Sequence, residues 1–349
     1  MMKIVAGLGS VEEYIPYVEA GAAELFCGFV PEEWMLSEGL YSPLNRREVL
    51  YYNVQIGSYS ELQILQHMIA QYGMPVTIAF NALSFAPHQY PKVMEIMEAC
   101  MEIGFHRFIV ADVALLLYLR QNMEPAKWDR LRLHLSGETA EINRYMLREM
   151  KKLGIRRVIF HRKNAIPDME TIIGQESALE YEAFALNEMC HFTGAFCNSL
   201  HCDELTHACR LPYRLISRER EDKKFSEEAI SPMEETENPE DGKGSPENTK
   251  APGQEPEEII DCTGATGCGL CALWRLQQAG VTYLKLVSRG NYIENTIQDI
   301  RQLKKALDIL AESAGEKQYQ EKMKEALFGE KGCSGVCYYP EVTEIIREL

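Results

Sequence analysis

The chain has 349 residues, of which 46% are hydrophobic and 25% are charged, an ordinary globular composition. Its formal charge of −16 argues against broad binding to nucleic-acid phosphates. No apolar run reaches the ~18–20 residues that a membrane span needs, and the first residues do not resemble a secretory signal. We therefore expect a cytoplasmic protein with one large α/β domain or two smaller ones.

A pattern of helix end, glycine and short apolar strand occurs four times, at 19–28, 102–110, 152–160 and 278–286. Glycine at this position suits the left-handed cap that turns a helix back into a strand. Further strands are predicted between these repeats, at 3–8, 75–81, 131–137 and 178–186. Helical periodicity occupies much of the remainder, for example at 61–73, 141–154 and 293–310.

This alternation predicts about eight β-then-α units ending by residue 313, and hence a parallel sheet. The count favours closure into a (β/α)8 TIM-like barrel over 1–313. An open doubly wound sheet is the alternative, although 6–14 lacks the third glycine of a dinucleotide-binding turn. Residues 314–349 are expected to form a C-terminal helix and a cysteine-containing tail.

An acidic segment interrupts the predicted barrel. Between Ser226 and Glu258 there are eleven acidic residues and two lysines, a local charge of −9, together with five prolines. Such a segment cannot bury enough apolar surface to offset the entropy of ordering. We expect 222–258 to be a disordered insertion that acts as a solvated spacer.

A barrel of this kind places its active site at the C-terminal ends of the strands. The loop 43–48 also contributes Arg46 and Arg47, which could contact an anion or be solvated surface. Polar residues expected at the strand ends are Asn81, Asp112, Ser136, Glu138, His161, Arg162, Glu182 and Arg289.

The chain has eleven cysteines, most of them after residue 190. A group of soft thiolates selects an iron–sulfur cluster or zinc; unligated thiols are the remaining alternative. Only Cys268 and Cys271 have the two-residue separation common in zinc knuckles. Near the C-terminus, Cys333 and Cys337 could bind a further metal with Cys27, Cys262 or Cys271, but we expect them to be free thiols.

The cysteine-rich part resembles peptidase family U32, the collagenase-like peptidases. Segments 208–214 and 268–290 are similar to two further motifs of that family, and the resemblance covers most of 1–313. Tyr213 departs from it, because many members have a second cysteine there. The residues that carry the main signature are Glu182, Phe184, Cys190, Thr193, Gly194, Cys197 and Ser199.

The resemblance implies a [4Fe–4S] cluster on Cys190, Cys197, Cys209 and Cys268, with zinc as the alternative metal. It implies oxygen-independent hydroxylation of an RNA base or a small aromatic substrate. A peptidase acting on a peptide and a non-catalytic iron–sulfur protein with a protein partner are the alternatives. Lys285 and Arg289 would bind an anionic co-substrate. The catalytic candidates are Glu182, His161, Arg162, Glu138 and Asn81.

Overall fold

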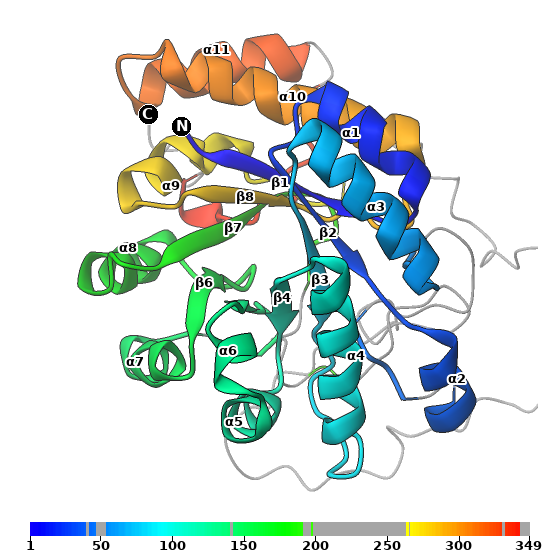
Figure 1. The fold of residues 1–349 in the computed structure, drawn as a ribbon. Coiled ribbons are helices and arrows are strands. Elements are labelled where there is room, and N and C mark those ends of the chain that lie inside the picture. Colours follow the sequence, from blue (N-terminus) through cyan, green and yellow to red (C-terminus); the bar gives the residue numbers. More distant parts are fainter. Residues whose placement is uncertain are drawn as a thin grey trace, which may run out of the picture. The chain divides into compact units, whose positions relative to one another are not determined.

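The computed structural model describes residues 1–39, 42–46, 54–139, 142–190, 197, 263–264, 266–329 and 332–342. Its centre is a closed barrel of eight parallel strands in sequential order (Figure 1). The strands are β1 (Lys3–Leu8), β2 (Glu24–Gly28), β3 (Val76–Phe80), β4 (Arg107–Val110), β5 (Arg132–Leu135), β6 (Ile155–Ile159), β7 (Glu180–Leu186) and β8 (Tyr283–Leu286).

Helices surround the barrel (Figure 1). α10 packs on α1 and α11 packs on α10. None of the described helices is both long and apolar enough to cross a membrane. The helices are α1 (Tyr14–Ala20), α2 (Glu32–Glu38), α3 (Tyr59–Tyr72), α4 (Tyr90–Ile103), α5 (Val113–Asn122), α6 (Pro125–Trp128), α7 (Arg144–Lys152), α8 (Ile166–Gln175), α9 (Leu273–Ala279), α10 (Ile293–Ala311) and α11 (Glu316–Leu327).

The structure confirms the predicted (β/α)8 barrel. Closure is made by β1 and β8, where Lys3 pairs with Tyr283, so an open doubly wound sheet was the wrong alternative. The repeat glycines behave as the pattern predicted: Gly21 ends α1 at a φ of 107° and Gly280 ends α9 at 97°. The predicted disordered insertion, 222–258, lies outside the described residues.

The interior of the barrel is polar in one layer, where many barrels have branched apolar side chains. Arg157 of β6 is fully buried and donates to both carboxylate oxygens of Glu24 on β2, at 2.8 and 2.9 Å. It also donates to Glu182 of β7 at 3.2 Å, and Thr77 of β3 donates to Glu24 at 2.9 Å. The bonds between Arg157 and Glu24 join strands on opposite sides of the barrel, and the other two join neighbouring strands.

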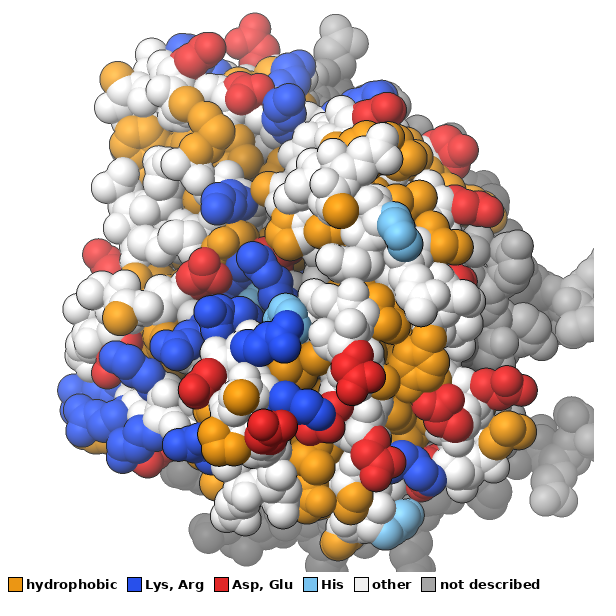
Figure 2. All heavy atoms as spheres, in the orientation of Figure 1, with side chains coloured by type: hydrophobic (Ala, Val, Ile, Leu, Met, Phe, Trp, Pro, Cys, Tyr) orange, Lys and Arg blue, Asp and Glu red, His pale blue; other side chains and the backbone are white. Residues whose placement is uncertain are grey.

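One face of the molecule gathers Lys and Arg side chains over the region of α6, α7 and β6 (Figure 2). Exposed basic residues of this region include Arg130, Arg132, Lys151, Lys152 and Arg156. Arg132 is the first residue of β5 and Arg156 the second of β6. This basic surface therefore lies toward the amino-terminal ends of the strands.

Candidate functional site at the barrel mouth

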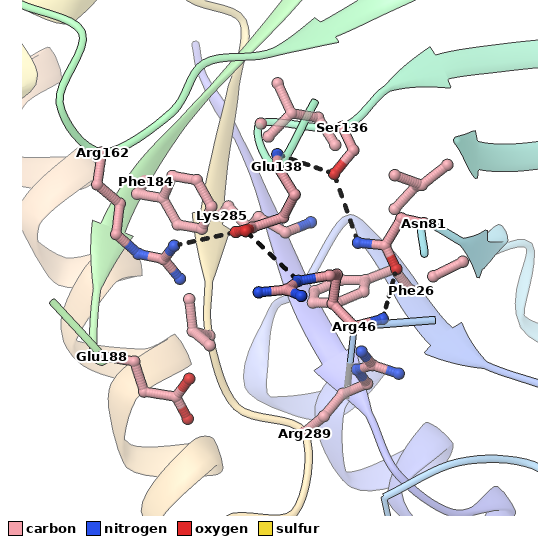
Figure 3. Close-up of a pocket in the computed structure, with 15 residues that line it drawn as sticks. Phe26, Arg46, Asn81, Ser136, Glu138, Arg162, Phe184, Glu188, Lys285 and Arg289 are labelled. Atoms are coloured by element: carbon pink, nitrogen blue, oxygen red, sulfur yellow. Dashed lines mark hydrogen bonds and ion pairs between the residues drawn. The ribbon is translucent and has the colours of Figure 1, made fainter. Parts of the chain in front are cut away.

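A pocket of about 80 Å³ lies at the carboxyl-terminal ends of the strands, the position expected for a barrel active site (Figure 3). Seven of the polar residues that the sequence singled out line it: Arg46, Asn81, Ser136, Glu138, Arg162, Lys285 and Arg289. They come from β8 and from the loops after β2, β3, β5, β6 and β8. The structure thus brings together side chains that are more than two hundred residues apart in the sequence.

Glu138 links two arginines across the pocket. Its Oε1 lies 3.5 Å from Arg162 Nη1, and its Oε2 lies 3.7 Å from Arg46 Nε (Figure 3). The backbone N–H of Glu138 donates to Ser136 Oγ at 3.1 Å, and Asn81 Nδ2 donates to the same oxygen at 3.4 Å. These contacts order the loop after β5 against the end of β3.

Arg162 is almost fully buried and its guanidinium lies over the ring of Phe184, 4.0 Å from the centroid. Burial works against the charged form, but Tyr338, Glu138, Cys190 and Glu188 outweigh it, so the pKa of Arg162 is raised. Cys190 therefore lies within electrostatic range of a pocket arginine.

Arg289 passes close to the backbone of β2. A Cβ added at Gly28 would lie 2.4 Å from Arg289 Nη1, so only glycine leaves room for this side chain. Arg289 Nη1 donates to Asn45 Oδ1 at 3.0 Å. Lys285 Nζ lies 3.5 Å from the ring centroid of Phe26, which also lines the pocket. Phe26 and Phe184 thus form two aromatic walls of the pocket, and each makes a cation–π contact, with Lys285 and Arg162 respectively.

Two predicted catalytic residues do not line the pocket. Glu182 lies in the middle of β7, where Lys285 Nζ donates to it at 2.9 Å and Arg157 donates to its other oxygen. Burial acts against its ionised form, but the charges of Lys285 and Arg157 hold its pKa below the ordinary value. Glu182 is thus part of the interior ion network.

His161 is the second of these residues. It is buried, its backbone N–H donates to Asn164 Oδ1 at 2.9 Å, and its Nδ1 accepts from Lys163 N at 3.2 Å. These contacts shape the loop after β6. In this arrangement His161 positions the loop that carries Arg162.

Sequence reasoning did not select Glu188 or the aromatic walls. Glu188 lines the pocket in a short turn after β7, with a φ of 54°. Phe184 appeared only as part of the cysteine-rich signature, and Phe26 only within a repeat. A signal was present for Phe184: it lies two residues after Glu182, on the same face of the strand and one step nearer to the strand end.

The predicted cluster cysteines are described in part. Cys190 is half-buried, Cys197 and Cys268 are buried, and Cys209 lies outside the described residues. Burial raises the pKa of the Cys268 thiol to about 12. Within the described part of the chain, no three His, Cys, Asp or Glu side chains are arranged to hold a metal ion as they stand.

By its fold and its pocket, this chain is a TIM-barrel protein with a cationic pocket at the carboxyl-terminal ends of its strands. The model of peptidase family U32 matches residues 9–333, nearly the whole length. This chain therefore belongs to peptidase family U32. No curated protein matches the sequence.

Among solved structures, the U32 peptidase Mk0906 is similar over 56% of this chain and 73% of its own, with 12% identity and a TM-score of 0.40. A putative dihydrodipicolinate synthetase from Pseudomonas aeruginosa is similar over 99% of this chain and 84% of its own, with 8% identity and a TM-score of 0.46.

Proposed function

We propose that this chain is a U32-family enzyme that holds a [4Fe–4S] cluster at the barrel mouth and hydroxylates a small anionic aromatic substrate, or an RNA base, without O2. The oxygen atom would be transferred from an anionic co-substrate, which is reduced in the same step. The observation that carries the proposal is the pocket itself. It combines two buried arginines, Arg162 and Arg289, with the rings of Phe26 and Phe184. Arginine matches a carboxylate or phosphate through paired N–H groups, and aromatic walls accept a planar ring.

The charges of the pocket favour an anion. Arg46, Arg162, Lys285 and Arg289 all line it, against the carboxylates of Glu138 and Glu188. Lys285 Nζ donates a hydrogen bond to Glu182 Oε1 in the interior of the barrel. Electrostatic attraction is stronger in a buried site of low dielectric constant than in water. An anionic group bound between the arginines would therefore be attracted strongly to them. Glu138 and Glu188 are the pocket carboxylates that can exchange a proton with a substrate.

A small substrate fits the described surface better than RNA does. The basic surface over α6, α7 and β6 (Figure 2) lies toward the amino-terminal ends of the strands. The pocket is lined by residues at the carboxyl-terminal ends (Figure 3). Nucleic acids need a basic path that leads to the reacting base. Within the described residues, the basic side chains of this surface do not supply that path, so the small substrate is the first candidate.

The proposal of a cluster depends on the chemistry of the available ligands. Thiolate sulfur is the ligand that iron–sulfur clusters take, and three or four of Cys190, Cys197, Cys209 and Cys268 would hold it. Cys190 lies within electrostatic range of Arg162, which supports a cluster beside the pocket. When bound, such a cluster would supply one-electron transfer. The chain's own residues would bind the anion, orient the ring and move the proton.

A peptidase is the second candidate because the family carries that description. Such an enzyme needs a nucleophile with a base or an activated water. The hydroxyl of Ser136 in the pocket accepts hydrogen bonds from Asn81 and from the Glu138 backbone, neither of which is a base. The described contacts of His161 are with its own loop. These described contacts support the peptidase less than the hydroxylase.

The test compares cells that express the wild-type chain, Arg162→Gln or Cys197→Ala during growth without oxygen. Mass spectrometry of phenolic acids and of RNA nucleosides would detect a gain of one oxygen atom. The proposal expects a product with the wild type that both variants lose. No such product from protein loaded with a cluster would overturn it, and cleavage of gelatin by iron-free protein would establish the peptidase instead.

A further inference from the structure

A second group of cysteines lies beside the barrel, at the C-terminal tail. Cys268, Cys271, Cys333 and Cys337 together line one cavity of about 50 Å³. Cys271 lies in a short 3-10 turn (Leu270–Ala272) that leads into α9. Cys333 and Cys337 follow α11. The sequence left a further metal on Cys333 and Cys337 with Cys271 as the alternative to free thiols, and the cavity adds Cys268 to these three.

Backbone pairing brings the two halves of the group together. The N–H of Cys268 donates to Val336 O at 2.8 Å, and the N–H of Tyr338 donates to Cys268 O at 2.9 Å. Ser334 Oγ donates to Gly264 O at 3.0 Å. These bonds hold the tail beside Gly264 and Cys268. The four cysteines are therefore brought together by backbone and side-chain hydrogen bonds of the fold.

The spacing within each half suits a thiolate metal site. Cys268 and Cys271 are separated by two residues, and Cys333 and Cys337 by three, both within the range of structural zinc sites. Gly335 makes the turn between the two tail cysteines, with a φ of 72°.

The surroundings favour a soft cation held by sulfur alone. The described lining contains no His, Asp or Glu, so thiols are its metal ligands. Phe328 and Tyr339 give it apolar walls, and Lys324 supplies a positive charge that would offset the excess of four thiolates over one divalent ion. A cavity of this size suits a single ion better than a core of four irons and four sulfides.

We propose that Cys268, Cys271, Cys333 and Cys337 form a zinc site that ties the C-terminal tail to the barrel. Among the described residues the sulfurs do not form a ligand set as they stand, and binding the ion would require their side chains to change between staggered rotamers. Metal binding commonly completes such sites, because the ligands converge only when the ion is present.

Cys268 belongs both to this group and to the set that family resemblance implies for the cluster. Within the described residues, Cys268 lines one cavity with Cys271, Cys333 and Cys337, and its backbone pairs with the tail segment that carries the last two. The inference therefore assigns Cys268 to the zinc site. Cys190, Cys197 and Cys209 would then hold the cluster.

The proposed site has a consequence for the pocket. Tyr338, the residue after Cys337, donates to Asn187 O, and its ring centroid lies 6.4 Å from that of Phe184. Tyr338 also affects the ionisation of Arg162. An ion bound by Cys337 would therefore fix a wall of the barrel mouth, one residue away from the metal ligand.

The test uses the full chain purified without oxygen from zinc-supplemented cells. We expect about one zinc ion per chain, and after exchange with Co²⁺ the intense absorption of cobalt bound to thiolates. Cys333→Ser and Cys337→Ser should each lower zinc content at least about tenfold. Cys100→Ala, which removes a buried thiol of α4, is the control that should keep it. Circular dichroism would check that the barrel stays folded.

A second measurement does not depend on variants. Cys333 is exposed, so an alkylating reagent should reach it in the apo protein. Bound zinc should protect Cys271, Cys333 and Cys337 from alkylation, and a chelator should remove the protection. Wild-type protein without zinc and without the cobalt–thiolate absorption would overturn the inference, as would zinc content that both serine variants retain.

The same preparations separate this inference from the proposed function. Cys190→Ala and Cys197→Ala should lose iron and keep zinc, whereas Cys268→Ser should lose zinc and keep iron. Zinc without iron in the wild type would overturn the cluster alone, and iron without zinc would overturn the tail site alone. Loss of iron with retention of zinc in Cys268→Ser would show that Cys268 binds the cluster and that its assignment to the zinc site is wrong.

Discussion

Arg162 and Glu138, from the loops after the neighbouring strands β6 and β5, face each other at the barrel mouth, with 3.5 Å between Arg162 Nη1 and Glu138 Oε1. The same guanidinium lies over the ring of Phe184, 4.0 Å from its centroid. This arrangement holds a buried positive charge in a fixed position beside an aromatic wall. It is the part of the pocket on which recognition of an anionic aromatic molecule depends most.

The first prediction concerns this arginine. Arg162→Gln should weaken binding of an anionic aromatic probe such as benzoate by about tenfold, because it removes one charge-assisted pair of hydrogen bonds. Arg162→Lys should recover only part of the affinity, since an ammonium group cannot bind in the same two-pronged way. Isothermal titration would measure both. The exposed Arg144→Gln is the control, and equal affinities for all four proteins would contradict the assignment.

The second prediction uses the close approach of Arg289 to β2. Gly28→Ala would place a Cβ only 2.4 Å from Arg289 Nη1, so the guanidinium must move. We expect the probe affinity to fall as far as it does in Arg289→Gln, with little change in the free energy of unfolding. Gly174→Ala, where a Cβ meets nothing within 4 Å, is the matched control. Unchanged affinity in Gly28→Ala would mean that Arg289 does not contact the probe.

The third prediction concerns the ion network inside the barrel. Arg157→Met would leave Glu24 buried without its main partner and remove one of the two cations on Glu182. We expect a loss of about 3–5 kcal/mol in the free energy of unfolding, measured in urea. The neighbouring Arg156→Met changes an exposed side chain and should cost less than about 0.5 kcal/mol. A small loss in Arg157→Met would show that the network is not needed for stability.

The fourth prediction concerns pH. Burial raises the pKa of Glu13 to about 7, against hydrogen bonds that include one from the Gly9 backbone. The folded state therefore binds this proton more tightly than the unfolded state, whose carboxyl titrates near 4.5. Its contribution to stability is complete below pH 4.5 and is lost as the pH rises to about 7.

Glu13→Gln should remove this loss, because the amide stays neutral. We expect the variant to exceed the wild type by roughly 3 kcal/mol at pH 8 and to match it near pH 4. Urea unfolding at the two values would measure the difference. The exposed Glu149→Gln is the control. A difference of the same size at both values would assign the effect to something other than titration.

The barrel could be predicted from sequence because its repeat is local. Each unit carries its own helix end, glycine and apolar strand, and the cap at Gly21 needs no distant contact. The pocket residues Asn81, Glu138 and Arg162 followed from the same pattern, since each comes directly after a strand. Parallel strands bring such positions to one edge regardless of their separation along the chain.

The rest of the site depends on contacts that sequence does not show. Glu182 and Phe184 share one face of β7, but only the length of the strand inside the barrel decides that Glu182 lies in the interior network. The cavity that joins Cys268 to Cys333 and Cys337 depends on the tail returning to pair with Cys268. No local periodicity marks that return.

The central claim, a cluster beside the cationic pocket, is tested most directly by iron and acid-labile sulfide analysis of protein purified without oxygen, together with electron paramagnetic resonance of the reduced form. The account predicts about four irons and four sulfides per chain. It also predicts that Cys190→Ala and Cys197→Ala lose both and that Cys100→Ala keeps both. Folded wild-type protein with neither iron nor sulfide, even after reconstitution, would contradict it.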